Sequence, residues 1–125
     1  MTIQKAKTIV VDAIANRKIL EMIYQHSTDD QSVEHTIAPL DIGSTNPDRK
    51  KSSAELLFAY SYTHLDKEGR KKPKVCAFKI PNIIELRDTG STFDPIEIAN
   101  LNRKATGYDY RDCDFALLPN RDWYS

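Results

Sequence analysis

The first part of the chain carries a helical pattern of apolar residues. Between residues 3 and 16 the apolar positions recur in steps of three and four, so they share one face of a helix: Ile3, Ala6, Ile9, Val10, Ala13 and Ile14. Thr2 predicts an N-cap before this run, and Asn16 suits a left-handed residue at its end. The pattern predicts a helix over residues 3–16 that packs on the rest of the fold through the last four of these apolar residues.

After residue 17 the pattern becomes that of β-strands. Residues 19–26 are apolar on both faces, which is typical of a strand buried on both sides. Turn-forming residues 27–32 lead to residues 33–38, which alternate strictly and place His35 on an apolar face. Pro39 has no N–H to donate, so pairing is expected to weaken there.

Three further strands are predicted downstream of a long polar loop at residues 43–54. Residues 55–63 alternate between two faces, and a charged connection at residues 64–73 leads back through a strand at residues 74–80. Residues 82–88 predict a short last strand that ends at the turn Asp88-Thr89-Gly90. Because a sheet of this size hides its edges by closing or half-closing, the strands predict a small barrel.

The last part of the chain begins with a second helix. Asp94, Pro95 and Glu97 form a helix start, so a short helix is expected from residue 95 to about residue 102. Residues 103–125 read as an irregular tail with five aromatic residues: Tyr108, Tyr110, Phe115, Trp123 and Tyr124. A free tail would not hold so many, and we expect these rings to pack on the barrel or on a partner.

Composition limits the class of protein. The chain has 125 residues, which suits one domain, and 18 basic residues balance 18 acidic ones, so no net field steers it toward nucleic acid or a membrane. No signal peptide or spanning segment is visible, and the 2 cysteines form no disulfide framework. We therefore expect a cytoplasmic protein that does not insert into membranes.

Enzyme and metal motifs are missing from the sequence. The 4 glycines are isolated, so no loop cradles a phosphate, and no nucleophile or metalloprotease motif occurs. His26 and His64 have no metal-site spacing, and the aspartates at 109, 112 and 114 lack the glycine and distal glutamate of a calcium loop. The expectation is a protein without catalytic activity, metal or cofactor.

Basic residues gather at two places in the sequence. One group lies in the connection between two strands and comprises Lys67, Arg70, Lys71, Lys72 and Lys74, and the other comprises Arg49, Lys50 and Lys51. The first four predict phosphate contacts with nucleic acid, although a solvated hairpin tip is the alternative. Because the two groups leave opposite ends of strand 55–63, one compact basic patch is not expected.

Four stretches, taken in order, carry a resemblance to a known family. They are residues 12–18 running into strand 19–24, Glu34-His35-Thr36-Ile37-Ala38-Pro39-Leu40, Leu56-Leu57-Phe58-Ala59-Tyr60, and Phe78-Lys79-Ile80-Pro81-Asn82-Ile83 with Phe93 downstream. Their order and spacing over residues 9–95 resemble the WYL domain, a small barrel related to the SH3 and Sm folds. The resemblance implies a ligand-sensing module of bacterial transcription regulators. Some WYL domains bind single-stranded nucleic acid, and others act in phage defence and CRISPR systems.

The chain resembles a degenerate, stand-alone member of that family. Its namesake triplet reads Glu55-Leu56-Leu57, His35 stands where the family has an arginine, and Lys79 keeps a cation at a matching position. The expected fold is α+β, mainly β, with a strongly bent antiparallel sheet or SH3/Sm-like barrel. A single domain would cover residues 1–125, with a helix in 1–17, barrel strands in 18–90, and a short helix and aromatic tail in 94–125.

These observations predict a ligand-binding site and a function. A pocket or groove for an anionic ligand would be lined by five residues: Tyr24, His35, Tyr60, Lys74 and Lys79. Alternation puts Lys79 on the opposite face from Lys74, so both can join one site only if the strand bulges. The expected function is a non-catalytic module that senses a ligand or nucleic acid. The alternative is an interaction module that dimerises or docks through its aromatic tail.

Overall fold

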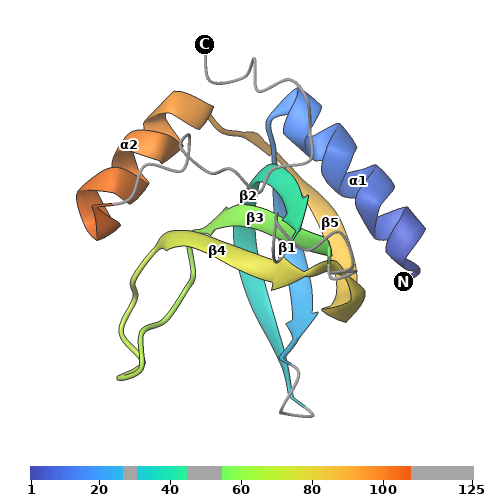
Figure 1. Cartoon of the computed structure of the whole chain (residues 1–125), viewed down its shortest axis with the longest axis horizontal. Helices are drawn as coiled ribbons and strands as arrows, with labels where there is room; N and C mark the ends of the chain where they lie inside the picture. Colours follow the sequence, from blue (N-terminus) through green and yellow to red (C-terminus); the bar gives the residue numbers. More distant parts are fainter. Residues whose placement is uncertain (27–30, 45–54, 108–125) are drawn as a thin grey trace.

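The fold combines five strands with a helix at each end of the described chain (Figure 1). The computed structural model describes residues 1–26, 31–44 and 55–107. Its elements are α1 (Ile3–Asn16), β1 (Lys18–Gln25), β2 (Ser32–Ser44), β3 (Glu55–Ser61), β4 (Lys74–Lys79), the 3-10 helix η1 (Ile80–Asn82), β5 (Ile83–Thr92) and α2 (Pro95–Thr106). The predicted α+β, mainly β class is confirmed.

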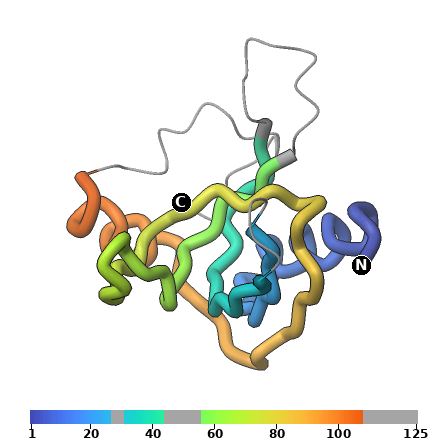
Figure 2. The backbone as a smooth tube through the Cα atoms, turned by 90° about the horizontal axis from the view of Figure 1, so that it is seen from below, coloured from blue at the N-terminus to red at the C-terminus, as the bar shows by residue number. Residues whose placement is uncertain are grey.

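The five strands form one antiparallel sheet in the order β4-β3-β2-β1-β5. The two edge strands, β4 and β5, follow each other directly in the chain and are joined by η1. Figure 2 shows this β4–β5 segment arching round the other three strands. The strongly bent antiparallel sheet predicted from the sequence is therefore present.

Helix α1 begins and packs as its sequence predicts. The Thr2 hydroxyl accepts a hydrogen bond from the Lys5 N–H at 3.1 Å. Of the predicted apolar face, Ala6, Val10, Ala13 and Ile14 are buried against the sheet and Ile9 is partly buried, whereas Ile3 is exposed. The left-handed residue at the end is Arg17, with φ of 57°, rather than Asn16. Asn16 stays in the helix because its side-chain amide donates to the carbonyl and the carboxylate of Asp12.

Three elements are longer than the sequence predicts. β2 runs past Pro39, since a register shift between Pro39 and Asp41 absorbs the missing donor. β5 continues through Gly90, where φ is +82° and the Asp88 carboxylate accepts from the Gly90 N–H at 2.8 Å, so the predicted turn is an irregularity inside a strand. α2 extends to Thr106 and ends at Gly107.

Two apolar clusters lie on the two faces of the sheet. One joins α1 to the concave face and includes Leu20, Met22, Ile37, Leu57 and Phe78. The other lies beneath α2 and comprises Ala38, Leu40, Phe58, Tyr60, Phe93 and Ile98. The predicted alternation of residues 55–63 between two faces is confirmed by this division.

Some predictions fall outside the described residues. The basic run 49–51 and the five aromatic residues of the tail at 108–125 are among them. Within residues 1–26, 31–44 and 55–107, no helix is both long enough and apolar enough to cross a membrane.

Candidate ligand-binding pocket

A pocket of about 660 Å³ opens where the β1–β2 and β3–β4 hairpins leave the sheet. Figure 1 shows both hairpins extending away from α1, so the helix and the pocket lie toward opposite ends of the sheet. The lining residues come from β1, β2, β4 and the β3–β4 connection: Tyr24, His26, Val33, Glu34, His35, Thr63, His64, Leu65, Lys74, Val75, Cys76, Ala77 and Phe78. A space of this size suits a small molecule.

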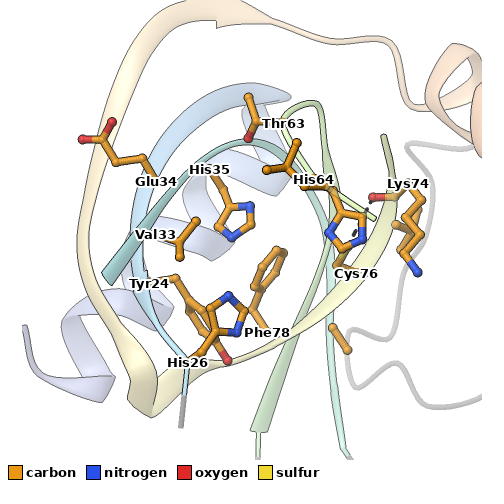
Figure 3. A pocket seen from close by; sticks show the side chains of 13 residues that line it. Tyr24, His26, Val33, Glu34, His35, Thr63, His64, Lys74, Cys76 and Phe78 are labelled. Atoms are coloured by element: carbon orange, nitrogen blue, oxygen red, sulfur yellow. Dashed lines mark hydrogen bonds between the residues drawn. The ribbon is translucent and has the colours of Figure 1, made fainter. Parts of the chain in front are cut away.

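Four rings form a connected cluster at this pocket (Figure 3). The Phe78 ring lies 5.1 Å from both Tyr24 and His35, and the His26 ring lies 5.1 Å from Tyr24 and 6.2 Å from His35, measured between centroids. The rings meet edge to face, which is the favourable arrangement for aromatic pairs. Their packing gives the pocket a preformed wall of π surfaces.

His35 is the buried polar group of this wall. Alternation along β2 turns its ring inward, and its side chain is 6% exposed. Nδ1 lies 3.1 Å from the Ser61 hydroxyl, whereas Nε2 has no hydrogen-bond partner among the described residues. Buried polar atoms are nearly always paired, so an unpaired one at a pocket marks a position that a ligand or water can fill.

The environment keeps His35 uncharged at neutral pH. Burial, followed by the neighbouring His26 and His64, lowers the pKa of His35 from 6.5 to about 4. Burial, followed by Lys74 and Lys72, likewise lowers the pKa of His64. The two rings therefore present neutral donors and acceptors to a bound molecule at pH 7.

Two side chains at this pocket, Ser61 and Cys76, carry groups that can act as nucleophiles in other proteins. Ser61 forms a serine–histidine pair with His35, but Ser61 is 0% exposed and its hydroxyl cannot reach a substrate in the pocket. Burial raises the pKa of the Cys76 thiol, so this thiol stays protonated and unreactive.

The structure brings together three of the five predicted ligand-binding residues. Tyr24, His35 and Lys74 line the pocket. Tyr60 lies on the opposite face, in the cluster beneath α2, where burial raises the pKa of its phenol. Lys79 is exposed outside the pocket, and its backbone N–H donates to the Tyr24 hydroxyl at 2.9 Å.

The predicted nucleic-acid contacts all lie on the β3–β4 hairpin. Lys67, Arg70, Lys71 and Lys72 are exposed there. The Arg70 guanidinium pairs with Asp66 at 3.3 Å and with Glu68 at 3.1 Å, so part of its charge is neutralised within the hairpin. Contact with nucleic acid remains a prediction for these four residues.

Sequence reasoning missed the convergence of the histidines. All 3 histidines of the chain line this one pocket, although His64 is far in sequence from His26 and His35. A partial signal was available, since alternation places His26 on the same face of its strand as Tyr24. His64 gives no such signal because it lies in an irregular connection. In the described parts of the chain, no three His, Cys, Asp or Glu side chains are placed to hold a metal ion.

Comparisons with known proteins bear on the fold. Neither a protein-family model nor a curated protein matches the sequence. Among solved structures, the chain is similar to proteasome accessory factor B/C (PafBC) of Arthrobacter aurescens, with a TM-score of 0.58 and 18% identity. The similarity covers 78% of this chain and 13% of that chain. At this identity the likeness shows the fold alone.

Proposed function

We propose that this protein is a non-catalytic, cytoplasmic ligand-sensing module, and that its ligand is a small planar anion bound in the pocket between the two hairpins. The observation that carries the proposal is the buried His35 ring, which lines the pocket and whose Nε2 has no hydrogen-bond partner among the described residues. A regulatory role agrees with the WYL-like fold, because the resemblance implies sensing modules of transcription regulators.

The chemistry of the wall supports a planar, negatively charged molecule. Tyr24, Phe78 and His26 present ring surfaces against which a flat molecule can pack. Lys74 lines the β4 side of the same pocket and is the lysine among its described lining residues. The arrangement combines apolar surface with a few convergent polar groups, which is typical of small-molecule sites.

A binding screen at low ionic strength tests the proposal. The probes are AMP, 2-naphthalenesulfonate, a short oligothymidylate and, as a cationic control, choline. Binding is followed by calorimetry and by the ring resonances of the 3 histidines, which report directly on the pocket. We expect AMP or the sulfonate to shift the His35 and His26 signals, and choline to leave them unchanged.

Two variants separate the pocket from the basic hairpin. Lys74→Ala removes the cation that lines the pocket, and Lys71→Ala removes an exposed cation of the hairpin. Pocket binding predicts that only Lys74→Ala weakens a small anion. If the oligothymidylate binds and Lys71→Ala is the variant that weakens it, the module reads nucleic acid on its hairpin instead. If no probe binds and the protein has the solution mass of a dimer, the interaction-module interpretation replaces this proposal.

A further inference from the structure

One nitrogen of the His35 ring is hydrogen-bonded, and the other is buried without a partner among the described residues. Nδ1 is held by the Ser61 hydroxyl at 3.1 Å, and Ser61 is itself fully buried. Nε2 lies in a side chain that is more than nine-tenths buried, and it has no partner among the described residues. Nε2 is therefore the atom at which this ring can share a proton with a molecule in the pocket.

Charged and titratable groups lie round this ring in two cavities. Those of the pocket are Tyr24 from β1, His26 directly after it, Glu34 from β2, His64 from the β3–β4 connection, and Lys74 and Cys76 from β4. His35 also borders a neighbouring cavity, where Glu21 of β1 and Arg87 of β5 pair with each other at 3.1 Å. Glu34 is the acid among the described residues that line the pocket, and Figure 3 shows its carboxylate directed away from the His35 ring. Asp66 acts on His64 instead, where it opposes the lowering of the pKa by Lys74. A proton on His35 thus lacks a counter-charge within the described pocket.

Building on the proposed function, we propose that the pocket binds its planar anion together with a proton, which His35 takes up on Nε2. In the empty pocket the imidazolium is disfavoured, because it is buried and faces other basic groups. An anion in contact with Nε2 supplies the missing negative charge and a hydrogen-bond acceptor, and both stabilise the charged ring. Occupancy would then depend on pH as well as on ligand concentration.

The size of the effect follows from linkage. The pKa of His35 is about 4 in the empty pocket, and an anion beside the ring raises it. Between the two pKa values the complex holds one more proton than the free protein and ligand. The affinity therefore rises by up to about tenfold for each pH unit of acidification in that interval.

A permanently ionised probe isolates this effect. 2-Naphthalenesulfonate keeps its charge between pH 5 and pH 8, so a change in affinity reports on the protein, and 2-naphthol is the neutral control of similar shape. We expect the sulfonate to bind more tightly at about pH 5.5 than at about pH 7.5 by at least about tenfold. Calorimetry in two buffers of different ionisation enthalpy should show uptake of nearly one proton at the lower pH. Affinity for 2-naphthol should stay constant.

Two glutamine variants locate the proton. His35→Gln keeps a polar side chain that does not titrate, and it should flatten the pH profile of sulfonate binding. His26→Gln removes an exposed ring of the same pocket and should keep most of the slope. If the slope survives in His35→Gln and disappears in His26→Gln, the assignment to His35 is overturned. Should His35→Gln fail to fold, the His35 ring resonances of the unmodified protein, titrated with and without sulfonate, give the same answer through the shift in pKa.

The outcomes distinguish this inference from the proposed function. Sulfonate binding with a flat pH profile and no proton uptake refutes proton coupling and leaves the ligand pocket standing. Failure of the sulfonate to bind at any pH, while AMP binds, also refutes the inference, because a permanently charged planar anion is the simplest occupant it names. Failure of all probes at every pH refutes the proposed function as well.

Discussion

The two faces of the sheet each bury a polar side chain, and they treat it differently. Beneath α2, Asn102 is 1% exposed and its side-chain carbonyl accepts a hydrogen bond from the Val75 N–H at 2.8 Å. On the concave face, His35 lines the pocket, its Nδ1 is held by Ser61, and its buried Nε2 has no partner among the described residues. The first polar group is satisfied within the fold, whereas the second has a ring nitrogen without a described partner at the wall of the pocket.

This difference separates stability from binding. β4 is an edge strand, and Asn102 covers one of its backbone donors, which also discourages pairing with another chain. The face beneath α2 is therefore suited to holding the fold together. The His35 face carries the rings, the cavity and the nitrogen without a described partner, which is why the proposed function places the ligand there.

The largest expected effect comes from removing the polar contact beneath α2. Asn102→Leu leaves the Val75 N–H without its partner, so we expect the free energy of unfolding to fall by about 2–3 kcal/mol. Chemical denaturation measures this change. Asn100→Ala, at an exposed position of the same helix, should change stability by less than about 0.5 kcal/mol. A similar loss of unfolding free energy in both variants would show that the buried Asn102–Val75 hydrogen bond does not contribute more to stability than an exposed side chain.

A pH dependence of stability tests the buried histidine. The pKa of His35 is about 4 in the folded protein and 6.5 when unfolded, so the unfolded state binds more protons between these values. The stabilisation is complete above pH 6.5 and is lost as the pH falls toward 4. We expect a loss of about 1–2 kcal/mol relative to His35→Gln, because water at the open pocket reduces the full value. Parallel stability curves for the two proteins would contradict a neutral His35.

The two tyrosines predicted to bind ligand offer a sharper comparison. Tyr24→Phe removes the acceptor of the Lys79 N–H, and we expect it to cost about 1 kcal/mol of unfolding free energy. Tyr60→Phe should cost less than about 0.5 kcal/mol, since the ring packs beneath α2 and no hydrogen bond of its hydroxyl is seen within the described residues. Thermal unfolding of the pair checks the difference. Equal losses would mean that the Tyr24 hydroxyl contributes nothing to the fold.

The smallest expected effect concerns the two lysines of β4. Lys74 lines the pocket and Lys79 is exposed outside it, so Lys74→Ala should weaken a small anion by about three- to tenfold at low salt. Lys79→Ala should change affinity by less than about twofold and serves as the matched control. Calorimetry with 2-naphthalenesulfonate gives both values. If Lys79→Ala weakened binding more than Lys74→Ala, Lys79 would belong to the binding site, as the sequence predicts.

The sequence predicts local features of this protein well. The apolar period locates α1 to the residue, and Thr2 and Asp94 cap the helices where expected. Alternation assigns residues 55–61 to two faces correctly, since each face is buried against a different cluster. These features depend on residues that are close in sequence, so the pattern of apolar and polar residues predicts them.

Only the tertiary structure decides the lengths of the strands and the membership of the site. β5 continues through Gly90 because β1 lies beside it, and α2 passes the expected end while Asn102 bonds to β4. The 3 histidines lie together because the bent sheet brings three separate parts of the chain to the same pocket. Tyr60 and Lys79 do not line the pocket, because strand alternation turns their side chains to the opposite face of the sheet. Contacts between distant residues depend on the curvature and the register of the whole sheet. Neither property can be predicted from the order of residue types along one strand.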